Sequence, residues 1–277
     1  MSLHQGMSEV WLRRRGTRRP LERMFGAENI ATLREAALLP RDLRTLLPET
    51  RTGDDVVVLV HGLMATAGVF RPLRAELERS TGARVASFTY VSGMRVNVVA
   101  HKLAELVGRI SSGTRIHLVG HSLGGVVARH FVQELGGHTR VVQTVSLGSP
   151  FWGVAKAERF AVGVGADLRL SSEVLVRLRA RVDVGGVPHT SIVGGDDRVV
   201  GEPWRAMLAG GDVFVFAGLG HNGLLFDEEA AHIVVERIRR PPVTRRASTR
   251  PEPTRALPPA FVLSTARSMF EARSLAV

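Results

Sequence analysis

One serine in the chain has the neighbours that nucleophilic catalysis requires. Residues 120–124 read Gly-His-Ser-Leu-Gly, directly after the apolar run 116–119 and directly before a segment with helical periodicity. A serine between a strand and a helix can occupy the sharp turn called a nucleophile elbow, and the two glycines leave room for that turn. The N-terminus of the following helix also favours negative charge near the serine. We therefore predict that Ser122 is a nucleophile; the alternative is a glycine-rich turn whose serine only caps the helix.

His221 and two adjacent aspartates could complete this chemistry. A serine hydroxyl needs a base, and the base needs an acid that orients it. His221 lies in a glycine-flanked loop after one strand-like run, and Asp196 and Asp197 follow the strand-like run before it. Either aspartate could orient the histidine, although a loop aspartate can also cap its own turn. The order and spacing predict Ser122, one of these aspartates and His221 as a catalytic set.

A further motif could stabilise the negative charge that forms during attack on a carbonyl group. Residues 60–64, Val-His-Gly-Leu-Met, follow the first apolar run, where one backbone donor of an oxyanion hole is expected. We predict that the backbone N–H groups of Leu63 and Leu123 form this oxyanion hole. His61 is expected to shape the loop by hydrogen bonding and not to transfer protons.

The segments between these motifs alternate between strand-like and helix-like patterns. Residues 56–60 are an uninterrupted run of valine and leucine, which is typical of a strand buried on both faces of a parallel sheet. The alternation predicts right-handed βαβ units, and therefore an α/β fold with helices on both faces of the sheet. The predicted strands are 56–60, 84–90, 116–119, 141–147, 189–193 and 213–217, and the predicted helices between and after them are 69–80, 96–110, 123–135 and 228–239.

Three parts of the chain differ in composition. Residues 1–53 form a basic N-terminal appendage, with a helix predicted at 28–39 and a short helical turn around 43–47. Residues 54–240 carry the motifs and the alternating elements. Residues 241–277 are rich in proline and arginine, which predicts an extended linker followed by a short amphipathic segment.

Three motifs together resemble those of bacterial triacylglycerol lipases and esterases of the α/β-hydrolase superfamily. They are Val-His-Gly-Leu at 60–63, Gly-His-Ser-Leu-Gly-Gly at 120–125 and Leu-Gly-Ser-Pro-Phe-Trp-Gly at 147–153. The resemblance covers about residues 54–240. It implies the α/β-hydrolase fold, with a mostly parallel central sheet, and the activity of a serine hydrolase on esters.

The resemblance also bears on the acid and on the acyl site. Lipases of this kind place the catalytic aspartate ahead of a short pair of isoleucine or valine residues, which fits Asp197 better than Asp196. In the third motif, Phe151 and Trp152 replace the polar or histidine pair that is usual in the family. The substrate-binding residues that we expect are therefore Phe151, Trp152 and Met64.

The connection formed by residues 151–188 is longer than an ordinary crossover, and hydrolases build lids at this position. A helix is predicted to begin near residue 172, with Leu175, Leu178 and Val182 on one apolar side. Our hypothesis is a lid of one or two helices whose apolar side covers Ser122. The alternative is a crossover helix that packs the same side on the sheet.

The net charge of +11, from 37 basic and 26 acidic residues, is located at the two ends of the chain. Residues 1–24 contribute +4 and residues 237–277 contribute +7, so residues 25–236 are neutral. A neutral body argues against a fold that binds specific nucleic acid. The basic ends are expected to be solvated tails; contact with an anionic membrane or nonspecific contact with nucleic-acid phosphates are the alternatives.

Composition excludes several other classes of site. The absence of cysteine excludes disulfides, a thiolate nucleophile and zinc sites built on sulfur. No His-Glu-x-x-His or His-x-His spacing occurs, so we expect neither a metal site nor a cofactor. Because no signal peptide and no apolar run of 18 residues is recognisable, a soluble, cytoplasmic protein is expected.

The sequence therefore predicts a serine hydrolase that acts on carboxylic esters, with acyl lipids or similar small molecules as substrates. A thioesterase, an amidase or an acyltransferase could use the same three residues, because fold and catalytic set are shared across these reactions. A binding protein on a hydrolase scaffold would be expected to lack one of the three residues, and here each is present.

Overall fold

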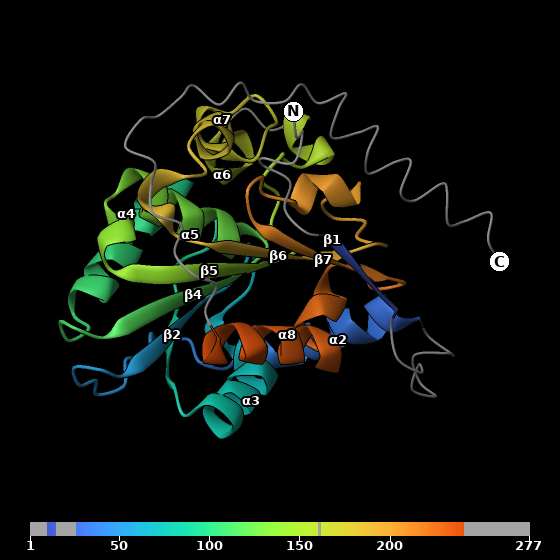
Figure 1. Ribbon diagram of the computed structural model, residues 1–277. Coiled ribbons are helices and arrows are strands. Elements are labelled where there is room, and N and C mark those ends of the chain that lie inside the picture. The colour runs from blue at the N-terminus through green and yellow to red at the C-terminus, as the bar shows by residue number, and fades with distance from the viewer. Residues whose placement is uncertain (1–9, 15–25, 160–161, 241–277) are drawn as a thin grey trace, which may run out of the picture. The chain divides into compact units, whose positions relative to one another are not determined.

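A seven-stranded parallel sheet forms the centre of the molecule (Figure 1). The computed structural model describes residues 10–14, 26–159 and 162–240, which belong to one compact unit. The strand order is β1-β7-β6-β5-β4-β2-β3, and all six neighbouring pairs are parallel. The strands are β1 (Val10–Arg14), β2 (Asp55–Val60), β3 (Arg84–Phe88), β4 (Arg115–His121), β5 (Val141–Leu147), β6 (His189–Gly194) and β7 (Asp212–Ala217).

Helices cover both faces of this sheet, which confirms the predicted architecture. Successive side chains of β2 point to opposite faces: Val58 packs with α4 and α5, whereas Val57 packs with α3 and α8. Because both faces are buried, β2 needs apolar residues at every position after Asp55. The helices are α2 (Ala27–Leu38), α3 (Arg71–Thr81), α4 (Val96–Gly108), α5 (Leu123–Glu134), α6 (Gly163–Asp167), α7 (Glu173–Ala180) and α8 (Glu228–Arg239).

The parallel arrangement brings the predicted functional loops to one edge of the sheet. Residues 61–64 follow β2, Ser122 follows β4, Asp197 follows β6, and His221 follows β7. Since the carboxyl ends of parallel strands lie at the same edge, side chains from four distant segments can meet there.

Two segments near the N-terminus differ from the prediction. The helical turn expected around residues 43–47 is wrong, because Leu46 forms an antiparallel bridge with Ser87 through two backbone hydrogen bonds of 2.9 Å. The free edge of β3 thus determines the conformation of this segment. Strand β1, which extends the opposite edge of the sheet beside β7, was not predicted.

The connection formed by residues 151–188 contains α6 and α7, and α7 packs on the end of α5. Leu175 and Leu178 are fully buried in the same core as α5, and Gln133 Nε2 donates a hydrogen bond to the carbonyl oxygen of Leu178 (3.4 Å). Gln133 is about 16 Å along α5 from Ser122, at 1.5 Å per residue. We therefore correct the lid hypothesis for α7: its apolar side is used in the core, as in the crossover alternative.

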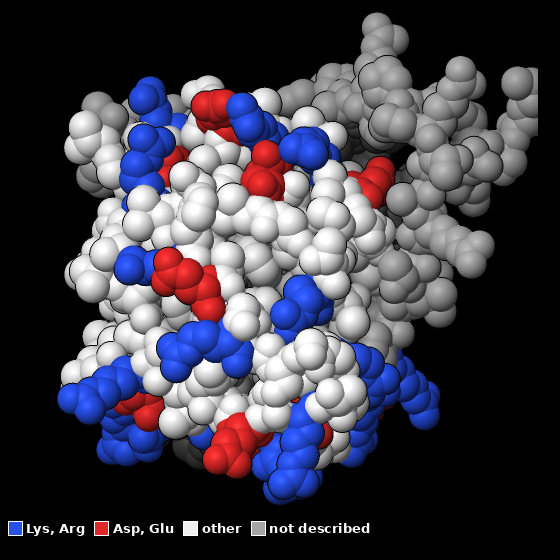
Figure 2. Space-filling model, turned by 90° about the vertical axis from the view of Figure 1, so that its left-hand side faces the viewer, with Lys and Arg blue, Asp and Glu red and all other residues white. Residues whose placement is uncertain are grey.

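Several expectations about the ends of the chain lie outside the described residues. These are the proline- and arginine-rich segment 241–277 and most of the basic start. On the face in Figure 2, basic and acidic side chains are interspersed over the described body. Arg115 and Asp55 form one of the ion pairs of the described residues. Among the described helices, none combines the length and apolar character that a membrane crossing requires.

Candidate active site

Ser122 occupies a strained turn between β4 and α5. Its backbone angles are φ 52° and ψ −124°, in a region that residues with a side chain rarely adopt. The Ser122 N–H donates a hydrogen bond of 2.9 Å to the carbonyl oxygen of Leu147 at the end of β5. The turn is therefore held against the sheet, and the half-buried serine is presented at its carboxyl edge.

Glycines flank Ser122 because the chain approaches itself closely at this turn. A Cβ atom at Gly124 would lie 1.9 Å from the carbonyl oxygen of Val60. A Cβ atom at Gly120 would lie 2.3 Å from the backbone nitrogen of Gly125. Both distances are far below van der Waals contact with backbone atoms, so the Gly-x-Ser-x-Gly pattern follows from packing.

His221 and Asp197 form a buried hydrogen-bonded pair. His221 Nδ1–H donates to Asp197 Oδ2 over 2.7 Å, and both residues are 5% exposed. The other carboxylate oxygen, Asp197 Oδ1, accepts hydrogen bonds of 2.9 Å from the backbone N–H groups of Val199 and Val200. Asp196 is exposed. Of the two aspartates considered from the sequence, Asp197 is thus the one that contacts the histidine.

The loop after β5 connects the serine to this pair. Leu147 accepts the hydrogen bond from Ser122, and a Cβ atom at the next residue, Gly148, would lie 3.2 Å from His221 Nδ1 and 3.3 Å from Asp197 Oδ2. The structure therefore brings the three predicted residues to one place. The role of Gly148 was missed, because its need for a small residue comes from two loops distant in sequence.

The loop after β2 is fixed beside Ser122 by His61. A Cβ atom at Gly62 would lie 3.0 Å from the Cβ atom of Ser122. His61 Nδ1–H donates to the carbonyl oxygen of Gly62 (2.8 Å), and His61 Nε2 accepts from the N–H of Tyr90 (3.2 Å). Because a trans peptide directs its C=O and N–H oppositely, the N–H of Leu63 points away from His61.

Burial supports the neutral tautomer of His61 that this arrangement needs. Burial lowers the pKa of His61 to about 4, although the hydrogen bond to Gly62 acts in the opposite direction. The second predicted donor, Leu123, is the first residue of α5, and the first N–H groups of a helix have no partner within it.

Comparisons with known proteins find one family model and several solved structures of similar fold. A family model described as palmitoyl protein thioesterase matches residues 56–185. Lipase B of Aspergillus fumigatus is 18% identical, with a TM-score of 0.58, over 70% of this chain and 55% of that chain. The chain has the α/β-hydrolase fold. A sequence comparison with curated proteins gives no match.

Two further structures resemble this chain in fold. The mature form of Bacillus licheniformis lipase BlEst2 is 15% identical, with a TM-score of 0.55, over 70% of this chain and 97% of that chain. The metagenomic carboxyl esterase MGS0156 is 17% identical, with a TM-score of 0.55, over 64% of this chain and 68% of that chain. Similarity at these identities establishes the fold alone.

The sequence pattern did not predict a role at the site for His121, the residue before Ser122. It is buried, its ring centre is 4.7 Å from that of His221, and its Nε2–H donates to the carbonyl oxygen of His221 (3.3 Å). Burial, followed by the nearby His221, lowers the pKa of His121 well below its usual value. The fold therefore keeps a neutral imidazole against the predicted base.

The three residues expected at the acyl site differ in how far they are exposed to solvent. Met64 is 75% exposed at the carboxyl edge. Trp152 is half-buried, and its Nε1–H donates to the carbonyl oxygen of Met207 (3.1 Å). Phe151 has no exposed surface and packs edge-on against His189, 5.2 Å between ring centres. We correct the expectation for Phe151, because its ring belongs to the core and not to an accessible wall.

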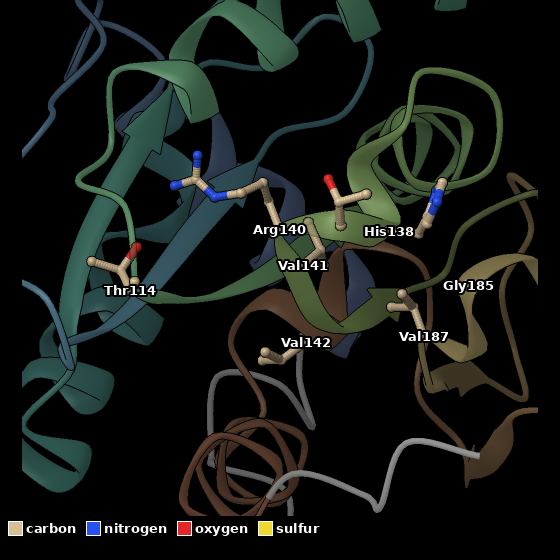
Figure 3. Close-up of a pocket in the computed structure, with 9 residues that line it drawn as sticks. Thr114, His138, Arg140, Val141, Val142, Gly185 and Val187 are labelled. Atoms are coloured by element: carbon tan, nitrogen blue, oxygen red, sulfur yellow. The ribbon is translucent and has the colours of Figure 1, made fainter. Parts of the chain in front are cut away.

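A cleft of about 340 Å³ lies away from these residues (Figure 3). It is lined by Thr114, His138, Arg140 and Val142, among others, where β4 and β5 begin. This is the amino edge of the sheet, opposite the edge that carries Ser122. The cleft is therefore distinct from the candidate active site. Within the described part of the chain, no group of three or more histidine or acidic residues is arranged to hold a metal.

Proposed function

We propose that this α/β-hydrolase cleaves carboxylic esters of acyl chains, with Ser122 as nucleophile, His221 as base and Asp197 as orienting acid. The observation that carries the proposal is the strained turn at Ser122 beside the buried His221–Asp197 hydrogen bond of 2.7 Å. Backbone strain of this kind persists only where the surrounding structure holds it in place. Here the hydrogen bond to Leu147 of β5 and the close packing at the flanking glycines hold the turn.

In the proposed reaction, His221 Nε2 takes the hydroxyl proton as Ser122 Oγ bonds to the ester carbonyl carbon. The N–H groups of Leu63 and Leu123 hold the resulting oxyanion. The C–O bond to the alcohol then breaks, and His221 returns the proton to the departing oxygen. A water molecule, deprotonated by His221, attacks the acyl-enzyme and releases the carboxylic acid and free Ser122. Asp197 holds the histidine tautomer and stabilises its positive charge.

Exposed aliphatic side chains favour an acyl substrate. Leu63 and Met64 follow β2, Val91 follows β3, and Val199 follows β6, all at the edge that carries Ser122. Exposed apolar side chains gathered at one edge are typical of a surface that binds an apolar partner. Their position supports acyl lipids or similar esters as substrates.

Thioesters are the second candidate substrate class. The match of residues 56–185 to a palmitoyl protein thioesterase model favours this class. The proposed steps would be the same, except that the bond broken is C–S and the leaving group is a thiol. The same catalytic residues serve both substrates, so the choice depends on measured rates.

Ser122→Ala tests the nucleophile. We expect it to lower kcat on p-nitrophenyl esters by about three to six orders of magnitude and to abolish labelling by a fluorophosphonate. Ser80→Ala, on α3 and remote from the site, is the matched control and should keep both properties. Labelling of the Ser122→Ala protein at wild-type rate would refute the assignment.

The substrate class is tested with an ester and a thioester that carry the same acyl chain. A larger kcat/KM for the ester supports the primary proposal, and a larger value for the thioester supports the second candidate. Repeating both series with chains of increasing length tests the acyl preference. Rates that do not rise with chain length would contradict the role of the exposed aliphatic edge.

A further inference from the structure

Helix α2 contacts the loop that carries the proposed base, although it precedes the segment matched by the family model. Glu28, in the first turn of α2, accepts two hydrogen bonds from consecutive backbone N–H groups. Its Oε1 is 2.7 Å from the nitrogen of Asn222, and its Oε2 is 3.1 Å from the nitrogen of Gly223. One carboxylate of the N-terminal region thus binds the two residues that follow His221.

Two glycines of the histidine loop make space for this carboxylate. A Cβ atom at Gly220 would lie 2.3 Å from Glu28 Oε2, and a Cβ atom at Gly223 would lie 3.3 Å from the same oxygen. A second link is the hydrogen bond of 3.1 Å from Asn222 Nδ2 to the Thr32 hydroxyl oxygen. The glycine directly before His221 is therefore explained by contact with α2, whereas Gly223 is confined more closely by the Leu219 side chain, 2.8 Å from such a Cβ atom.

The peptide between His221 and Asn222 is held at both ends. Its carbonyl oxygen accepts from His121 Nε2–H, at the nucleophile turn, and its N–H donates to Glu28. A peptide unit is planar, so it cannot rotate without breaking one of these hydrogen bonds. Rotation of this peptide would change the direction of the His221 side chain, which Asp197 holds from the other side.

Helix α2 also carries a carboxylate, Glu35, that interacts electrostatically with His221. Burial raises the pKa of Glu35, whereas the charge of His221 lowers it and that of Glu28 raises it. Glu35 of α2 therefore lies within electrostatic range of the His221 imidazole.

We propose that Glu28 is a positioning residue for the catalytic base: it fixes the His221–Asn222 peptide, and through it the His221 imidazole. The proposal rests on the proposed function of His221. Glu28 itself contacts neither the substrate nor the reacting atoms.

Glu28→Gln and Glu28→Ala test this role in the full-length protein. Gln keeps the shape of the side chain but offers one acceptor oxygen instead of two. We expect Glu28→Gln to lower kcat on a p-nitrophenyl ester about 10- to 100-fold, because small misplacements of catalytic groups have effects of this size. KM should stay within about twofold of the wild-type value. Glu173→Gln, on the exposed side of α7, is the matched control with wild-type kcat.

The outcomes separate this proposal from the proposed function. Wild-type kcat in folded Glu28→Gln protein, with Ser122→Ala inactive, overturns the role of Glu28 and leaves the proposed function intact. The low-field proton NMR signal of His221 Nδ1–H gives a readout without substrate. A shifted or lost signal in Glu28→Gln supports positioning, and an unchanged signal overturns it, even if the wild-type protein cleaves no ester. If Glu28→Ala does not fold, Glu28→Gln decides.

Discussion

Asp196 and Asp197 are chemically identical neighbours, and the turn after β6 gives them different surroundings. The Asp197 carboxylate is enclosed and accepts hydrogen bonds from His221, Val199 and Val200, whereas Asp196 is exposed to solvent. These three donors fix the orientation of the Asp197 carboxylate, as an acid that orients a histidine requires.

The two aspartates therefore offer a matched pair of variants. We expect Asp197→Asn to lower kcat on a p-nitrophenyl ester by about 10³- to 10⁴-fold, because an amide cannot stabilise the charged histidine and can favour the wrong tautomer. Asp196→Asn should stay within about threefold of the wild-type rate. Equal losses in the two variants would argue against Asp197 as the orienting acid.

Residues differ in how far the sequence reveals their position. Ser122 was predictable because its signals, the flanking glycines and the adjacent strand and helix, are all local. Asp197 could be preferred to Asp196 only by resemblance, since both fit the local pattern. Glu28 could not be found, because its hydrogen bonds join residues 194 and 195 positions apart. Phe151 was misjudged because its place in a motif does not indicate which way its ring points.

At the scale of elements, the turn at Ser122 depends on close packing of α5 against the end of β2. Gly124→Ala would bring a methyl group to 1.9 Å from the Val60 carbonyl oxygen. Since backbone must move to relieve this contact, we expect a loss of about 3 kcal/mol in the free energy of unfolding, measured by urea denaturation.

Gly108→Ala is the control for this change. Gly108 is the exposed last residue of α4, and a Cβ atom there would meet nothing within 4 Å. In a helix, alanine in place of glycine stabilises by about 0.5–1 kcal/mol. A Gly124→Ala protein that is as stable as the Gly108→Ala protein would contradict the packing argument.

Elements with strong periodicity were predicted, and elements that depend on distant partners were not. Strand β2 is apolar after Asp55 because both faces of the sheet are covered, and this pattern is visible in the sequence. Strand β1 is short, includes two arginines and acquires its conformation by pairing with β7. For α7, amphipathicity indicated a buried side but could not indicate which neighbour buries it.

At the scale of the whole molecule, buried histidines connect stability to pH. Burial lowers the pKa of His61 to about 4, and burial also lowers the pKa values of His121, His130 and His189. In the unfolded chain these histidines bind protons near pH 6.5. Between about pH 6.5 and 4 the unfolded state therefore binds more protons, so the stability that is complete above this range is lost as the pH falls.

We expect the urea midpoint to decrease steadily from pH 7 to pH 4. For His61 alone, the difference between 6.5 and about 4 corresponds to about 3 kcal/mol. His61→Gln should reduce the proton uptake on unfolding by about one. A midpoint that is constant over this pH range would contradict the argument.

The contact between Glu28 and residues 222–223, together with the pairing of β1 with β7, has a consequence for biosynthesis. Helix α2 leaves the ribosome early, and its partners are synthesised almost 200 residues later. At 5–20 residues per second this interval is about 10–40 s. Throughout it the N-terminal segments lack the surfaces that they bind, and closing such distant contacts is slow. A nascent chain can thus contain Ser122 in its completed turn before the proposed hydrolase activity is present.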